Sequence, residues 1–189
     1  MSMALRARGL SAKRRSAGTA YFPSNAGLTP SGTNTDPTQP GGLILATLLS
    51  ATSAGVVAKG IRFWMPPEGV GQTLTSFLFA GATGASVLAQ GIDTPAVSGF
   101  NELLFATPYN MVNGAAVAAA IFIRPVSGDS LNNVSYSAVA NALATAKTVS
   151  PLQTSVPGSR YNYGNPSLNG GGDTGTSSAW YGVDLMIAA

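Results

Sequence analysis

The chain has 189 residues, which is enough for one domain with appendages. Only 9% of its residues are charged, 45% are hydrophobic, and neither Cys nor His occurs, so the sequence excludes disulfides, Cys or His metal sites, Ser-His-Asp triads and Cys-His nucleophiles. Because a free monomer usually carries more surface charge, we expect neighbouring chains to cover much of the surface. The alternative is a secreted or virion domain that is stable with few charged residues on its surface.

Residues 1–20 are predicted to form a basic arm. They carry half of the ten positive charges and no acid, and the basic residues are Arg6, Arg8, Lys13, Arg14 and Arg15. The remaining sequence has five basic and seven acidic residues, so the net charge of +3 divides into +5 for the arm and −2 for the rest. Such an arm cannot bury its own charges cheaply, and we expect a partner chain in an assembly to hold it.

Nucleic acid is a weaker candidate partner for this arm. Five positive charges without neighbouring acids would bind the phosphate backbone non-specifically, with an affinity that falls as salt is added. The arm lacks interleaved aromatic residues, however, and the rest of the chain offers no excess of positive charge. Docking on a protein with acidic grooves is therefore favoured.

Residues 21–41 are predicted to be a linker, because four prolines would interrupt regular structure, namely Pro23, Pro30, Pro37 and Pro40. The folded domain is predicted over residues 42–189. Its strands are indicated by apolar runs and alternating patterns between turn residues, at 43–51, 56–65, 74–80, 86–90, 101–105, 115–124 and 180–188. Short strands at spacings near ten residues predict an all-β fold, an antiparallel β-sandwich of jelly-roll or immunoglobulin-like type.

The predicted strand over residues 56–65 has two distinct faces. One face is expected to carry Val57, Lys59, Ile61 and Phe63, and the other Val56, Ala58, Arg62 and Trp64.

Two later segments are less regular. Residues 135–148 place Val139, Leu143 and Ala146 at helical spacing, which fits either a short helix or an irregular excursion. Residues 149–178 are rich in Pro, Gly, Asn and Ser, and we expect a long loop with little core there.

No segment predicts a membrane span or a targeting signal. The most apolar stretches, residues 42–49 and 115–123, are too short to cross a bilayer, and the start of the chain is broken by its basic residues. No membrane partner is expected.

The carboxylates give no indication of catalysis. The acids beyond the linker are scattered along the sequence, at Glu68, Asp93, Glu102, Asp129, Asp173 and Asp184. A general acid–base pair could still form in space, but no clustered run of the kind that binds calcium is present. We therefore predict no catalytic residue, no metal site, no cofactor and no enzymatic activity.

Aromatic residues gather in the C-terminal part of the sequence. Tyr136, Tyr161 and Tyr163 lie among Asn and Gly residues, and such side chains can stack on sugar rings or form a protein-binding patch. They are the candidate contacts to a ligand or a host surface. Trp180 and Tyr181 are expected to pack locally at the start of the last strand.

Several motifs occur in an order that resembles a known family. They are GVVAKGIRFW at 55–64, TLTSFLFAG at 73–81, VLA at 87–89, GFNELLFATP at 99–108 and WYGVDLM at 180–186. Together they resemble a β-sandwich domain of unknown function found in bacterial surface proteins and phage tail proteins, over roughly residues 43–187. This sequence has Trp64 where that family usually has Tyr, and Leu185 and Met186 where it has a pair of Val residues.

The resemblance implies an adhesion or spacer module and no enzyme. The expected function is that of a bacteriophage virion structural protein, a minor tail or baseplate component held by its arm, with a host-surface glycan as a further partner. The expected partners are other virion proteins, with the chain present as a homo-oligomer or in several copies on a symmetric particle. A capsid decoration or head-fibre protein and a secreted carbohydrate-binding module are the two alternatives.

Overall fold

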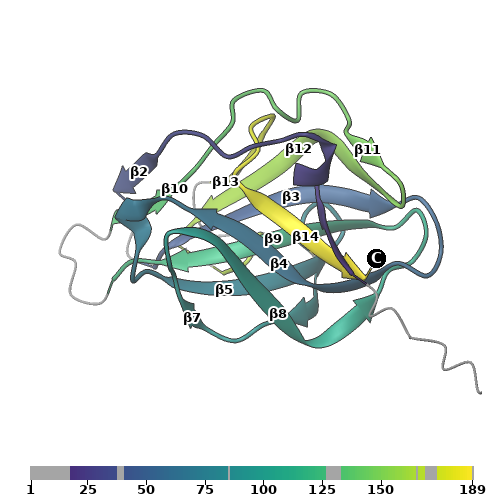
Figure 1. Cartoon of the computed structure of the whole chain (residues 1–189), viewed down its shortest axis with the longest axis horizontal. Helices are drawn as coiled ribbons and strands as arrows, with labels where there is room; N and C mark the ends of the chain where they lie inside the picture. The colour runs from purple at the N-terminus through teal and green to yellow at the C-terminus, as the bar shows by residue number, and fades with distance from the viewer. Residues whose placement is uncertain are drawn as a thin grey trace, which may run out of the picture.

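The computed structural model describes residues 18–37, 41–84, 86–126, 133–164, 166–168 and 174–188. Two antiparallel sheets lie one over the other, with the main hydrophobic core between them (Figure 1). The predicted all-β antiparallel sandwich is therefore confirmed. In the described part of the chain, no helix has the length and apolar character needed to cross a membrane.

The smaller sheet has four strands in the order β1 (Thr19–Phe22), β14 (Val183–Ala188), β4 (Val57–Met65) and β8 (Gly99–Asn110). Every neighbouring pair is antiparallel. The first described strand thus pairs with the last strand of the chain, and β1 and β8 form the two edges of this sheet (Figure 1).

The larger sheet follows the order β11 (Thr148–Val149), β12 (Leu152–Tyr163), β3 (Leu43–Ala51), β9 (Ala116–Arg124), β5 (Thr73–Ala80) and β6 (Val87–Gln90). Two short strands extend it, since β13 (Thr174–Ser177) pairs with β12 and β7 (Thr94–Pro95) pairs with β5. A separate two-stranded ribbon joins β2 (Asn34–Pro37) to β10 (Asn133–Tyr136). The short 3-10 turns η1 (Ser24–Ala26) and η2 (Pro67–Gly69) complete the described elements.

The central strands of the larger sheet are buried on both faces. Leu45, Leu49 and Ile121 face the smaller sheet and pack with its inward side chains, including Ile61 and Leu185. A second cluster lies on the opposite face of the same strands, and comprises Ile44, Ala46, Leu48, Phe77, Phe79, Ala118, Ala120, Phe122 and Leu168. Burial on both faces explains why β3 and β9 are continuous apolar runs without alternation.

The predicted linker contains regular structure, and that prediction is wrong. β1 crosses the expected boundary at residue 20, and β2 lies within residues 21–41. Both strands are tolerated near proline because β1 is a sheet edge that ends before Pro23, and Pro37 is the last residue of β2.

The prediction of a long loop over residues 149–178 is also wrong. β12 covers twelve of these residues and pairs with β3, so it belongs to the larger sheet. Its proline is accommodated because the β12–β3 register shifts between Thr154 and Ser159, and Pro157 falls inside that irregularity. Composition identified the proline but could not show that a bulge would absorb it.

The segment over residues 135–148 contains no helix. It begins with the end of β10, and Val139 then forms an isolated bridge with Trp180 before a series of turns. The Leu143 side chain is fully buried and lies against Gly158 of β12. Tertiary contacts on the strand framework thus override the helical spacing, which leaves the irregular excursion as the correct alternative.

The predicted assignment of β4 residues to the two faces of the sheet is wrong before residue 60 and correct after it. Ala58, Ile61 and Phe63 are all buried in the main core, whereas Lys59 is half-buried and does not belong to it. Against β14, Met186 pairs with Gly60 and Ile187 with Ala58, so Lys59 is one extra residue in β4 and the alternation changes face there. Arg62 and Trp64 consequently lie on the outer face of the smaller sheet.

Candidate functional site: an interaction surface on the smaller sheet

The residues predicted to contact a partner through the arm lie outside the described residues. Arg6, Arg8, Lys13, Arg14 and Arg15 all precede residue 18, where the description begins. The structure does show where the arm joins the domain, because β1 starts at Thr19 on one edge of the smaller sheet.

The three candidate tyrosines lie on strands and not in loops. Tyr136 ends β10 and packs edge-to-face on Tyr181, with ring centroids 5.9 Å apart. Tyr161 and Tyr163 belong to β12 and pack edge-to-face on each other at 5.8 Å. All three are half-buried against the main core, so part of each ring is engaged by the protein itself.

The described carboxylates do not form a metal site. Among the residues whose positions are described, no group of three Asp, Glu, His or Cys side chains lies close enough to hold an ion. Asp129 and Asp173 are outside this part of the chain. Asp93 instead accepts a hydrogen bond from Thr75 at 2.5 Å and forms an ion pair with Arg124.

The outer face of the smaller sheet carries a row of charges across three strands. Asp184 of β14, Arg62 of β4 and Glu102 of β8 are direct neighbours in the sheet register. Arg62 donates to Asp184 Oδ2 from Nη2 at 2.7 Å and from Nε at 3.1 Å. Glu102 accepts a hydrogen bond from the Tyr21 hydroxyl at 2.5 Å.

Residues of the first described segment complete this arrangement, which we call the Arg62 cluster and which comprises Tyr21, Ser24, Arg62, Phe100, Glu102 and Asp184. The Ser24 backbone N–H donates to Asp184 Oδ1 at 2.8 Å, and Arg62 Nη2 donates to Ser24 Oγ at 2.5 Å. The guanidinium also lies over two aromatic rings, 3.7 Å from the Tyr21 centroid and 4.0 Å from that of Phe100. These cation–π contacts and hydrogen bonds fasten β1 and η1 to the sheet.

The environment perturbs two acids of the Arg62 cluster. Burial raises the pKa of the Asp184 carboxyl, although the hydrogen bonds from Ser24 and Arg62 oppose that shift. The hydrogen bond to Glu102 is the main cause of the raised pKa of Tyr21, followed by burial. The Arg62 charge is compensated by Asp184, and Glu102 accepts a hydrogen bond from Tyr21, so the cluster fastens the first described segment to the sheet.

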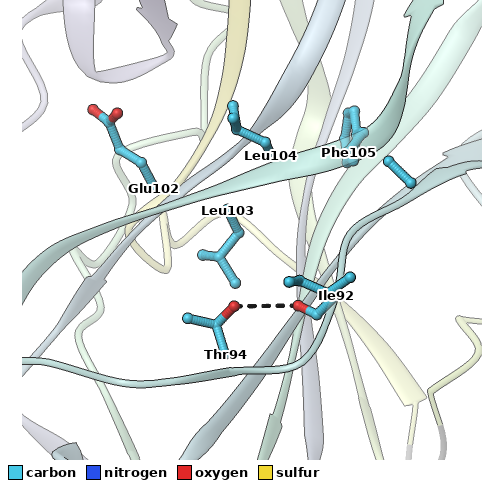
Figure 2. Close-up of a pocket in the computed structure, with 7 residues that line it drawn as sticks. Ile92, Thr94, Glu102, Leu103, Leu104 and Phe105 are labelled. Carbon is cyan, nitrogen blue, oxygen red and sulfur yellow. Dashed lines mark hydrogen bonds between the residues drawn. The ribbon is translucent and has the colours of Figure 1, made fainter.

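A groove lies beside the Arg62 cluster, along the edge strand β8. This β8 groove has a volume of about 380 Å³ and is lined by Ile92, Thr94, Glu102, Leu103, Leu104, Phe105 and Ala106. Figure 2 shows β8 on one side of it, and the chain from Ile92 to Thr94 on the other. Leu103 and Phe105 are buried and form the base, whereas 76% of Ile92 and 62% of Leu104 is exposed.

Sequence reasoning missed the β8 groove, although a signal was present. In β8 the buried positions Asn101, Leu103 and Phe105 alternate with exposed ones, and two exposed positions carry the apolar residues Phe100 and Leu104. Phe100 and Leu104 lie four residues apart on the same face of the strand, and exposed apolar side chains gathered on one face are typical of a surface that another molecule covers. Ile92 carried no such signal, because only the fold brings its loop beside β8.

Compared with protein-family models and with curated proteins, the sequence matches none. The resemblance to a surface and tail-protein domain therefore remains an expectation from the quoted motifs.

Proposed function

We propose that the chain is a virion structural protein that joins an assembly through its N-terminal arm and its exposed apolar surface. The β8 groove is the observation that carries this proposal. Ile92 and Leu104 both line it and are largely exposed, and a free monomer gains no stability from exposing them, whereas an interface would remove them from water.

Two further features support an assembly role. The domain carries few charges, and all five of its basic side chains are half-buried: Lys59, Arg62, Arg124, Lys147 and Arg160. Arg62 and Arg124 are also members of ion pairs. The arm, in contrast, concentrates five positive charges beyond the edge strand β1. This separation suits a protein whose basic arm anchors it to a partner and whose weakly charged sandwich packs against neighbouring subunits.

Within that role, a bacteriophage minor tail or baseplate component is our first placement, following the motif resemblance. A capsid decoration protein would use the same arm and the same groove. The proposed host contact through Tyr136, Tyr161 and Tyr163 has weaker geometric support, because their rings are partly occupied by packing.

The test is mass spectrometry on purified particles separated into heads and tails. The tail fraction should contain the protein, and a variant that lacks residues 1–17 should fail to incorporate. The cut belongs at residue 17 because Thr19 and Ala20 are part of β1. Recovery with the heads would make it a decoration protein, and absence from both fractions would overturn the proposal.

A further inference from the structure

We propose that the β8 groove receives the N-terminal arm, residues 1–17, of a neighbouring copy of the same chain. This inference rests on the proposed function, because it identifies the partner of the assembly surface described above.

The groove has the size and the chemistry for apolar side chains. Its volume of about 380 Å³ is many times the roughly 30 Å³ that one water molecule occupies. Its lining combines the buried Leu103 and Phe105 with an exposed rim of Ile92 and Leu104. In Figure 2, Leu103 points from β8 toward Ile92 and Thr94. Covering the exposed rim with apolar groups of a partner would be favourable at about 25 cal/mol per Å².

The arm supplies matching side chains. Its first ten residues interleave the apolar residues Met3, Leu5 and Leu10 with Arg6 and Arg8. An extended segment with this pattern presents apolar groups and positive charge together.

The charges of the two surfaces are also complementary. Glu102 is exposed on the groove lining and supplies negative charge there. Asp93, between the lining residues Ile92 and Thr94, is 56% exposed but already forms an ion pair with Arg124. The domain as a whole carries −2 against +5 for the arm. Attraction between them would position the arm and would weaken as salt is added.

The arm is long enough to dock on a neighbouring copy. The arm leaves the domain at β1 and the groove follows β8, and these are opposite edges of one sheet, separated by β14 and β4. Three strand spacings correspond to about 14 Å, whereas 17 extended residues reach about 55 Å, so an arm is long enough for the groove of a second molecule as well as for its own. Because the arm and the groove are different surfaces, two copies can exchange arms in a closed dimer, and more copies can form a ring or an open chain.

The experiment mixes two full-length variants that each lack one half of the contact. Leu104→Asp places a charge on the groove rim, and Leu5→Asp with Leu10→Asp places charges on the arm. Sedimentation velocity should show that the parent chain associates with rising concentration, while each variant alone stays monomeric. An equimolar mixture should form a one-to-one dimer and nothing larger, because only one intact arm and one intact groove remain between the two chains.

Val112→Asp is the matched control, since 61% of Val112 is exposed, as against 62% of Leu104. It should associate like the parent chain. A mixture that remains monomeric, a Leu104→Asp variant that associates normally, or a parent chain that is monomeric at every concentration would each overturn the inference. An arm folded onto its own groove would give the last of these results.

This failure can be told apart from a failure of the proposed function. If the mixture does not dimerise but the protein is recovered from particle tails, the virion role stands and the groove has another occupant. If the mixture dimerises but no particle fraction contains the protein, the arm contact stands and the virion role falls.

Discussion

Arg62 connects three strands and the first described segment of the chain through one guanidinium. It bonds to the fully buried Asp184 and to Ser24, and it lies over the rings of Tyr21 and Phe100. The Arg62 side chain is itself only 16% exposed, so each charge depends on the other for compensation. A buried ion pair of this kind adds little to folding stability beyond what two apolar residues would add. Removing one partner is strongly destabilising, because the other charge stays buried without compensation.

We predict that Asp184→Ala lowers the free energy of unfolding by about 2–4 kcal/mol, because the Arg62 guanidinium and the Ser24 N–H both lose their acceptor. Asp184→Asn retains one acceptor oxygen and should cost less. Asp93→Ala, in a pair whose side chains are 56% and 40% exposed, should cost under about 1 kcal/mol. Urea denaturation at neutral pH measures all three, and an equal loss for Asp184→Ala and Asp93→Ala would contradict this reading of the cluster.

The raised pKa of Tyr21 predicts a loss of stability in alkaline solution. A group whose folded-state pKa is raised stabilises the fold below its unfolded pKa, here about 10.0, and loses that contribution as pH rises through the folded value. Ionised Tyr21 would also repel Glu102. The parent chain should therefore lose stability above about pH 10 more steeply than Tyr21→Phe, as measured by denaturant midpoints between pH 7 and pH 11. If the denaturant midpoints of the two proteins fell in parallel with pH, this role of Tyr21 would be contradicted.

At the scale of elements, close approaches of the backbone determine the register of the smaller sheet. β4 changes register against β8 between Ala58 and Gly60, and a Cβ on Gly60 would lie 2.3 Å from the carbonyl oxygen of Leu103. No side chain fits at that distance, so glycine is required for β4 and β8 to pair on both sides of the bulge.

Gly60→Ala should therefore separate β4 from β8 and destabilise the protein by about 2 kcal/mol or more. Gly114→Ala is the control, because Gly114 has a φ of 77° but nothing within 4 Å of an added Cβ. Its backbone strain alone should cost about 1 kcal/mol. Thermal unfolding compares the two variants, and a smaller loss at Gly60 than at Gly114 would show that the strands adjust without cost.

At the scale of the whole molecule, the sandwich has a second core outside its main one. The outer face of β3, β5 and β9 is apolar, and Leu168 packs on it with none of its surface exposed. Leu168 lies just beyond the end of β12, so the segment that composition predicted as a featureless loop provides both a sheet strand and part of this cover.

We predict that Leu168→Ala destabilises the protein by about 2–5 kcal/mol, the usual range for a fully buried leucine. It should also increase the binding of an apolar dye such as ANS, because the outer cluster with Phe79 and Phe122 becomes accessible. Leu104→Ala, at a position that is 62% exposed, should change stability by less than about 0.5 kcal/mol. Unchanged dye binding in Leu168→Ala would mean that other contacts protect this face.

The sequence alone determined the fold class and the positions of most strands, because hydrophobic patterns and turn residues act locally along the chain. The runs at β3, β5 and β9 were found close to their observed bounds for that reason. The separation of the basic arm from a weakly charged domain was also readable, since charge is a property of composition.

Only the tertiary structure decided which residues meet. The ion pair of Arg62 with Asp184 joins positions 122 residues apart, and Ile92 reaches the groove because its loop folds against β8. The bulges in β4 and β12 shift side chains between faces without leaving a pattern in the sequence. Long-range pairing thus fixed the interaction surface, because strand partners and register depend on contacts that no local stretch of sequence contains.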